Sequence, residues 1–460
     1  MVVTKDSGLI DEGLICVPQN RTLYVDQFTS EAPLKPAILW PDDLNYVFEI
    51  LKPKASIALE DEEGNEVLES FAFKSINDFE DESLINQSKI LQTEKKVLKK
   101  NLSKVHQEIK RLEITYRTLG SFFDNVESGA FKDIVLMNVD RDQLVDCESR
   151  DFEGVRDELT RHYDSLSLKA NYSLLVVPGI IGDAPVIMMW ARMAYLCKVV
   201  LLTDFDDAED FCSLRARLES ANFQGEDIQL ANVVMTCNRL LGRSKSEIAG
   251  EESDLFIPGS AAVAGRMTRT DEIAIVQGIA GKEFGILNKV KGTRIHLSET
   301  EIAELVDLGV VPINEEGGQA IVCSSQSLYS GTISGLQEYP VIRLLDWIHK
   351  VLVNFIYLKT DFCFTISPLT IIELNKGIHD FLSDCQSDGS NKLIEDFIIE
   401  KIDLDRRVYD LTIQIRLKPQ HSHYNYVLEM TVPRDPYRYI SSIPIIQSCI
   451  KLGARVNKLD

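Results

Sequence analysis

The chain has 460 residues, of which 45% are hydrophobic and 26% charged, and its formal net charge is −22. This length is enough for two or three domains with buried cores, and the composition is that of a globular protein. The acidic balance argues against nucleic acid as a partner, because phosphate would be repelled. Nine cysteines without a C-x-x-C pair favour reduced thiols in a cytosol over disulfides or a zinc site.

Charge and hydropathy vary along the chain. From Lys401 to Asp460 there are ten basic and six acidic residues, so the end is basic and the rest strongly acidic. Such a chain would attract its own copies, although chance clustering explains the pattern equally well. Met1–Asp6 has no basic start before an apolar run, so we expect no signal peptide. The most apolar stretch, Leu174–Ala191, is interrupted by two prolines and an aspartate, so we expect no membrane insertion.

The first 80 residues mix short apolar segments with acidic turns. Ser56–Leu59 and Val67–Phe73 flank an acidic stretch that ends in Gly64-Asn65, a pair typical of turns. The pattern predicts a β-hairpin within a separate N-terminal segment, residues 1–80.

Residues 84–119 predict one long helix, in a segment that we bound at 81–125. Apolar residues recur every seven positions, with others four residues after them, and no Pro or Gly interrupts the run before Gly120. A polar helix with one narrow apolar seam packs on a partner helix or an adjacent domain, or folds back as an internal hairpin. The predicted seam residues are Leu91, Leu98, Leu102, Val105, Ile109 and Leu112.

Residues 126–335 predict the main domain, of the α/β class. Four apolar runs predict buried strands, and the segments between them have the length of helices. Strand, helix and strand at this spacing form a right-handed parallel unit. Because the runs are continuously apolar, we expect helices on both faces of the sheet. The predicted strands are Ile134–Met137, Tyr172–Val177, Lys198–Thr203 and Val233–Cys237, with a further one at Gln319–Cys323 after a Gly-Gly turn.

Residues 336–432 predict a C-terminal α+β domain. A helix with apolar positions at i, i+3 and i+4 starts after Pro340, and two alternating strands, Tyr409–Leu417 and Tyr424–Thr431, follow. Residues 433–460 form a basic tail that contains three prolines and several isoleucines. The apolar tail has to be buried by its own body or by a neighbour. The residues that we mark in the two strands are Tyr409, Leu411, Ile413, Ile415, Leu417, Tyr426 and Leu428.

Familiar catalytic motifs are missing from the sequence. Gly278-x-x-Gly281-Lys282 lacks the spacing of a phosphate-binding loop, and no nucleophile elbow or H-E-x-x-H motif is found. His421 and His423 form a weak candidate metal pair without a third ligand. Asp204 follows an apolar strand, where α/β enzymes place ligand-binding carboxylates, but acidic residues also end strands for solubility alone. We therefore expect no enzyme activity, no cofactor and no metal.

Residues 258–289 resemble the signature of contractile tail sheath proteins. Pro258 precedes small residues that lead to Ala264-Gly265, and Arg269-x-Asp271, Gly278 and Asn288 follow in the family's order. Further along the chain, other segments also match that family in order. They are Leu308–Asn314, followed by Gly317-Gly318, and Val341–Ile348, which matches the helix that opens the family's C-terminal domain.

Within that family the sequence is most similar to the large sheath subunit of type VI secretion systems, the TssC/VipB family, in its Bacteroidetes form. Asn171–Gly179 and Val234–Arg243 are among the segments that carry this resemblance, which covers roughly residues 110–430. The N-terminal part departs from it. Phe73–Phe79 and Leu84–Gln87 look more like the small sheath subunit, which implies that this chain partly replaces that subunit.

The resemblance implies a phage-tail-sheath-like fold with an extended arm, and a mechanical function in the bacterial cytoplasm. Family members polymerise around an inner tube, exchange terminal strands between subunits and contract to propel the tube. Strand exchange needs an exposed edge and an alternating apolar strand, and we expect Tyr409–Leu417 and Tyr424–Thr431, with the residues marked in them, to supply these. The implied partners are other copies of the chain, the small sheath subunit, the inner tube protein, a baseplate and an unfoldase that recycles the sheath. We expect an acidic helical surface between Ile371 and Glu400, including Glu395 and Asp396, to face the tube.

Two alternatives remain open at this point. A baseplate or cap component with the same fold would form small rings rather than long polymers. A nucleotide- or sugar-binding α/β enzyme would need a glycine-rich loop or a polar cluster at the strand ends.

Overall fold

The computed structural model describes residues 14–18, 56–60, 66–70, 110–126 without 112, and most of 135–432. Within the last range it leaves out 138, 140–142, 165–171, 180–182, 206, 248–252, 269–274, 334, 361–367, 387–391, 405–410 and 421. The strands are β1 (Leu14–Pro18), β2 (Ser56–Glu60), β3 (Glu66–Ser70), β4 (Val135–Met137), β5 (Tyr172–Val177), β6 (Val200–Asp204), β7 (Val233–Cys237), β8 (Leu240–Arg243), β9 (Leu255–Ile257), β10 (Ile286–Leu287), β11 (Val311–Glu316), β12 (Gln319–Val322), β13 (Ile394–Leu404), β14 (Leu411–Pro419) and β15 (Tyr426–Val432). The helices are α4 (Arg150–Asp164), α5 (Ala184–Cys197), α6 (Phe211–Ala221), α7 (Ser260–Met267), α8 (Gly281–Phe284), α9 (Glu299–Asp307), α10 (Tyr339–Thr360) and α11 (Pro368–Gln386), with short 3-10 turns η5 (Ile228–Asn232) and η6 (Lys245–Glu247).

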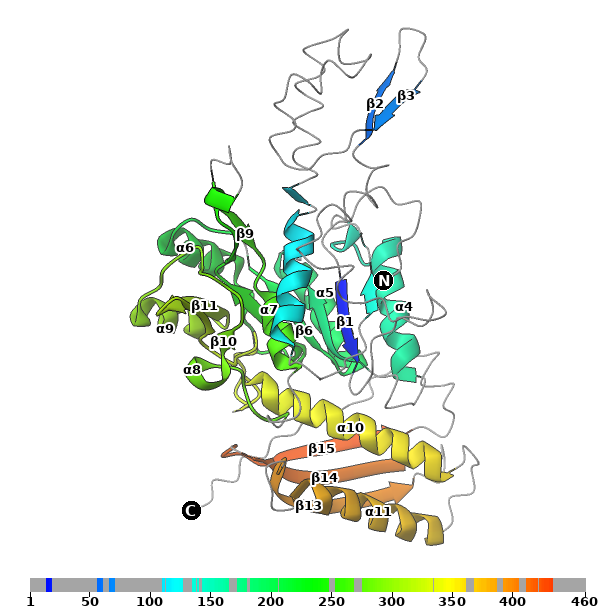
Figure 1. Ribbon diagram of the computed structural model, residues 1–460. Coiled ribbons are helices and arrows are strands. Elements are labelled where there is room, and N and C mark those ends of the chain that lie inside the picture. The colour runs from blue at the N-terminus through cyan, green and yellow to red at the C-terminus, as the bar shows by residue number, and fades with distance from the viewer. Residues whose placement is uncertain are drawn as a thin grey trace.

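An eight-stranded sheet forms the main domain (Figure 1). Its order is β10-β12-β11-β7-β6-β5-β1-β4, and the four central strands β11, β7, β6 and β5 run parallel. The predicted strand–helix–strand unit is confirmed, because β5, α5 and β6 follow one another and Leu174 pairs with Val200. The strand β1 was not predicted. It pairs antiparallel with β4 and β5, more than a hundred residues away in sequence.

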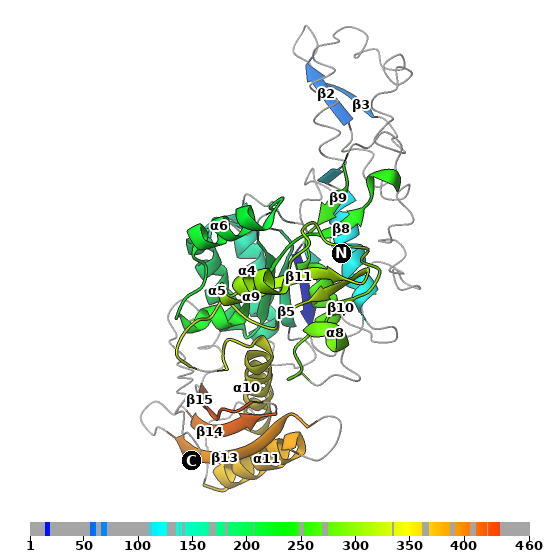
Figure 2. The same ribbon diagram turned by 90° about the vertical axis from the view of Figure 1, so that its left-hand side faces the viewer.

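Helices cover both faces of this sheet, as the continuous apolar strands predict. Along β5, Leu174 and Val176 belong to one buried cluster, while Leu175 and Val177 belong to the other. The first cluster includes apolar residues of α7, and the second includes those of α5 and α6. Figures 1 and 2 show the two layers of helices with the sheet between them.

Local sequence signals set the ends of several elements. Asp183 caps α5 by accepting a hydrogen bond from Val186 N, and the helix ends where Lys198 turns into the left-handed region at φ 54°. Ser298 and Glu301 form a capping box at the start of α9. Gly317 and Gly318 form the predicted turn between β11 and β12. Their φ angles are 61° and 81°, a backbone conformation in which a residue with a Cβ would be strained.

The helix that follows the predicted seam runs on to residue 125, beyond the expected break at Gly120. A glycine inside a helix costs only about 1 kcal/mol, and buried contacts on either side of Gly120 outweigh that cost. Phe122, on the far side of Gly120, is fully buried against the main domain. All six predicted seam residues lie outside the described residues, so their role stays a prediction.

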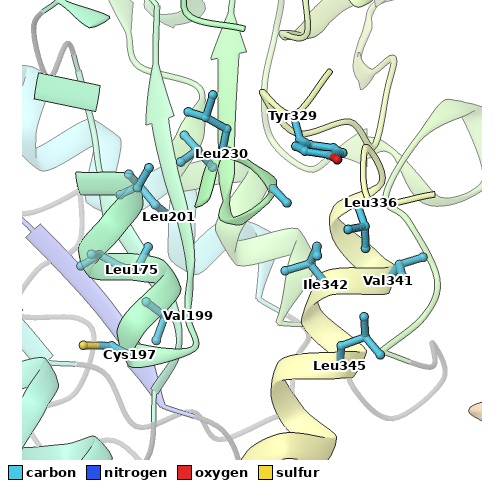
Figure 3. Packing of buried hydrophobic residues seen from close by; sticks show 14 of the residues in the cluster. Leu175, Cys197, Val199, Leu201, Leu230, Tyr329, Leu336, Val341, Ile342 and Leu345 are labelled. Carbon is cyan, nitrogen blue, oxygen red and sulfur yellow. The ribbon is translucent and has the colours of Figure 1, made fainter. Parts of the chain in front are cut away.

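The C-terminal domain consists of α10, α11 and the antiparallel sheet β13-β14-β15. The predicted strands at 409–417 and 424–431 are confirmed as β14 and β15, each displaced by about two residues. The helix α10 lies between this sheet and the main domain (Figures 1 and 2). Figure 3 shows Ile342 and Leu345 of α10 beside Leu175, Val199 and Leu201 of the main domain. All five belong to one buried cluster that also contains the inward residues of β14 and β15, so the two domains share a continuous core.

The hairpin predicted in the N-terminal segment is confirmed. Strands β2 and β3 pair antiparallel, with Glu60 opposite Glu66 on either side of the expected turn. Ser56–Glu60 matches the prediction closely, and β3 ends at Ser70, short of Phe73.

Candidate assembly surfaces

The carboxylate of Asp204 lies where an α/β enzyme would place a ligand-binding group. It is 3% exposed and already fully engaged. Its Oδ1 accepts hydrogen bonds from Gly259 N at 2.7 Å, Ser260 N at 2.8 Å and Thr236 Oγ1 at 2.6 Å. Its Oδ2 accepts from Gly179 N at 2.9 Å and from the Ser260 hydroxyl. Asp204 therefore links the start of α7 to the ends of β6 and β7 by hydrogen bonds. The start of α7 thus occupies the position next to the carboxylate that a ligand would take in an enzyme.

Metal-ligating clusters and membrane-spanning helices are absent from the described residues. In that part of the chain no three His, Cys, Asp or Glu side chains come together as a metal site would need. Of the candidate pair, His423 is exposed and His421 lies outside the described residues. No described helix is both long and apolar enough to cross a membrane.

The sheath-like signature holds the long helix against the main domain. A Cβ on Gly265 would lie 2.2 Å from Phe122 O, so only glycine lets α7 approach the helix this closely. The Asn288 main-chain N–H donates to Asn125 Oδ1 at 2.7 Å, and the Asn125 amide donates back to Asn288 O at 3.4 Å. The signature residues Gly265 and Asn288 therefore act in helix docking. Arg269 and Asp271 lie outside the described residues.

A buried ion pair fixes the same helix to β8. Arg243 Nε donates to Glu113 Oε1 at 2.7 Å, and the two side chains are 0% and 6% exposed. Arg117 Nε donates to the same oxygen at 2.8 Å, and its guanidinium also donates to Gly242 O at 3.0 Å. Sequence reasoning missed Glu113 as a docking residue, because a glutamate on a polar helix gives no sign of burial. The only indication in the sequence that this ion pair matters was that Arg243 lies in the segment Val234–Arg243, which resembles the family.

The strand β14 holds four of the residues marked for strand exchange. Leu411, Ile413, Ile415 and Leu417 are at most 1% exposed and point into the shared core. β14 pairs with β13 on one side and β15 on the other, so it presents no open edge to a neighbour. This placement corrects the expectation that β14 supplies an exposed edge. Its alternation marks a half-buried strand, and such a pattern is the same at the centre and at the edge of a sheet. Tyr409 lies outside the described residues.

The outer strands of the small sheet differ in regularity. β13 shifts register with β14 between Ile394 and Asp396 and again between Ile399 and Lys401, and five of its eleven residues are charged. β15 pairs with β14 without a bulge and has one charged residue, Glu429, which accepts a hydrogen bond from Gln414. Bulges and charges protect a strand edge from added strands, so β15 has the less protected edge. Tyr426 and Leu428 lie on this strand and point into the core.

The predicted acidic helical surface is only partly helical. Glu395 and Asp396 lie on β13, whereas α11 ends at Gln386. The two bulges of β13 disturb its period of two, which is why the sequence did not reveal a strand. Glu395 pairs with Lys418 at 2.6 Å, and Asp396 is exposed. Most of the exposed charged residues of α11 and β13 are acidic, namely Glu373, Asp380, Asp384, Asp396, Glu400 and Asp403.

Two protein-family models match the chain. Residues 104–330 match the model of the type VI secretion system TssC/VipB central domain, and residues 338–435 match that of the TssC/VipB-like C-terminal domain. The second match begins within one residue of the start of α10. No curated protein sequence matches the chain significantly.

Solved sheath structures are also similar. The sheath tail protein of Desulfitobacterium hafniense is 11% identical over 55% of this chain and 54% of its own, with a TM-score of 0.36. That of Listeria innocua is 10% identical over 60% of each chain, with a TM-score of 0.42. The anti-feeding prophage helical sheath in its contracted state is 15% identical over 66% of this chain and 78% of its own, with a TM-score of 0.44. The chain thus spans less than two thirds of the first two relatives, and the assignment of a family rests on the sequence models.

Proposed function

This chain belongs to the TssC/VipB family of contractile-sheath proteins, and on that premise we propose that it polymerises around an inner tube and contracts to propel that tube. The observation that carries the proposal is that both domains match models of this family. In the structure the signature residues Gly265 and Asn288 dock the long helix on the α/β domain. Members of this family are structural, so the energy of contraction is stored in interfaces between subunits and no catalytic site is needed. The engaged state of Asp204 agrees with this mechanism.

We further propose the bacterial cytoplasm as the location, with the inner tube, a small sheath subunit, a baseplate and a recycling unfoldase as partners. In this scheme segment 1–80 partly replaces the small subunit and helix 81–125 contacts a neighbour through its seam. Segments 126–335 and 336–432 form the body of each subunit, and 433–460 reaches the next one.

The test of the function is electron microscopy of the purified chain, alone and with its genomic neighbours. We expect long striated tubes. Tubes from the chain alone would indicate a one-component lattice, and tubes formed only with a small second protein would indicate a two-component lattice. Monomers or small rings under every condition would contradict the proposal and favour a cap or baseplate component.

We propose that the tail of one subunit adds a strand to the β15 edge of the next. The basis is the less protected edge of β15 together with the isoleucine-rich segment Ile443–Ile450 in the tail. The N-terminal strand β1 is a weaker donor, because it already pairs with two strands of its own chain.

Replacing Ile446 with aspartate is therefore expected to abolish tubes and leave a folded monomer, because a charge would replace an apolar side chain of the added strand. Gln447→Asp, which introduces the same charge at a neighbouring position that is already polar, is the matched control and should assemble. The readout is the fraction of pelletable polymer, with circular dichroism as the check on folding. Equal assembly of both variants would contradict the proposal that the tail donates a strand to β15.

We also propose that the acidic surface of α11 and β13 contacts the tube. Reversing charge with Glu395→Lys and Asp396→Lys should reduce co-sedimentation of tube with sheath at least tenfold, while polymers of the sheath alone persist. Glu148→Lys with Glu153→Lys, which makes the same charge change on exposed positions near α4, serves as control. Normal co-assembly of the β13 variant would exclude this surface.

A further inference from the structure

The helix α10 turns a polar stripe toward the main domain. Asp346, His349 and Lys350 lie three and four residues apart on one side of the helix, and each is at most 9% exposed. Lys198, just after α5, and Asn232, at the end of η5, are 6% and 1% exposed and face this stripe. Polar groups buried this deeply are rarely kept for stability alone, because apolar residues of similar volume usually serve as well or better.

Direct contacts tie the stripe to two elements of the main domain, η5 and β5. The Asn232 amide donates to Asp346 Oδ2 at 2.7 Å and to Val199 O at 3.0 Å. The Lys350 ammonium donates to the carbonyl oxygen of Tyr172, in β5. The Lys198 ammonium lies 3.9 Å from the ring centroid of Tyr195, in α5. The cluster is thus a built junction between the two domains, with Asp346 at its centre.

The charges of the junction do not balance. Two lysines share a single carboxylate, and burial lowers the pKa of His349 well below its ordinary value, so the imidazole adds no charge near neutral pH. Burial lowers the pKa of Lys350 to about 8, although Asp346 opposes the shift, and burial also lowers the pKa of Lys198. Burial raises the pKa of Asp346, against the attraction of the two lysines. The remaining titratable or charged groups nearby are Cys197 from α5, Arg343 from α10, Tyr195 and Tyr172, whose hydroxyl donates to Glu158 of α4.

We propose that this junction makes the docking of α10 on the main domain sensitive to pH, with proton uptake by Lys350 weakening the docked state and proton loss strengthening it. The geometric basis is that Lys350 is only 5% exposed and that its side-chain nitrogen is bound to the carbonyl oxygen of Tyr172, between α10 and β5. A proton on Lys350 leaves an excess positive charge enclosed between the domains, whereas the neutral amine leaves Lys198 and Asp346 as a balanced pair.

The direction of the effect follows from linkage. A lysine in the unfolded chain titrates near 10.4, so between about pH 8 and 10.4 the unfolded state binds more protons than the folded state. Stability should therefore rise with pH across this window. A pKa of about 8 corresponds to a roughly tenfold rise in the ratio of folded to unfolded chain between pH 7 and pH 9.

Urea unfolding of the full chain at pH 7 and pH 9, at one protein concentration, tests the proposal. From pH 7 to pH 9, the ratio of folded to unfolded chain should rise about tenfold more in the wild type than in Lys350→Met. Lys359→Met, on the exposed side of the same helix, is the matched control and should keep the wild-type dependence. If Lys350→Met retains the full pH dependence, the proposal is wrong.

Hydrogen exchange of the wild type decides the question even if Lys350→Met does not fold. After correction for intrinsic base catalysis, amides of α10 should gain protection from pH 7 to pH 9 relative to those of β11, which contains no residue of the junction. Equal changes in α10 and β11 would overturn the proposal.

Discussion

Replacing Asp204 with alanine should lower the free energy of unfolding by about 3–5 kcal/mol, the cost of breaking a buried charged network. The substitution leaves the main-chain N–H groups of Gly179, Gly259 and Ser260 without their acceptor in a site that water does not reach. Chemical unfolding followed by circular dichroism measures the loss. Because Asp204 holds the start of α7, Asp204→Ala should also loosen the surface that receives the long helix.

The matched control is Asp183→Ala, which removes another aspartate that accepts a main-chain hydrogen bond, at the exposed start of α5. An exposed cap of this kind is worth about 1 kcal/mol. A loss for Asp204→Ala no larger than that of Asp183→Ala would contradict the structural role and reopen a ligand-binding one.

Replacing Glu113 with alanine should cost about 3–5 kcal/mol as well, because it leaves Arg243 buried without its carboxylate. The loss should be concentrated at the long helix, whose amides would exchange faster than those of β6. The double substitution Glu113→Leu with Arg243→Met should recover most of the stability, since no charge then remains fully buried without its partner. Arg117 also loses the Glu113 carboxylate, but it is 20% exposed and keeps its hydrogen bond to Gly242 O. Urea unfolding of the two variants gives both values.

Glu219→Ala is the control for the removal of a glutamate from an ion pair. Glu219 and Arg215 form an exposed i,i+4 pair on α6, with 51% and 47% of their side chains exposed. Surface pairs of this kind contribute little, so the unfolding midpoint should not change. If Glu113→Ala behaves like Glu219→Ala, the buried ion pair does not hold the long helix in place.

The α/β domain could be predicted from the sequence because its strands are apolar throughout. The runs at β5, β6 and β7 are mostly apolar, so their burial and parallel order follow from local pattern and spacing. The strand β1 could not be found in this way, because its place depends on pairing with β4 and β5, far away in the chain. The bulges of β13 hid that strand for a different reason, since they interrupt its alternation.

The assembly residues were harder to predict than the fold. Alternation in β14 identified a strand correctly but carried no information on which neighbours it has. The roles of Gly265 and Asn288 could be inferred only from a resemblance. Neither an isolated glycine nor an isolated asparagine in a sequence indicates that a helix packs against it. Asp204 gave an ambiguous signal, which only the five hydrogen bonds to its carboxylate resolve.

The position of β1 has a mechanical consequence for the removal of a subunit from an assembly. Among the described strands, β1 is hydrogen-bonded to both β4 and β5, so its removal has to break two sets of hydrogen bonds. β15 is bonded to β14 alone within the described sheet, so its removal breaks one set. We therefore expect a motor that pulls on a subunit to meet more resistance at β1 than at β15.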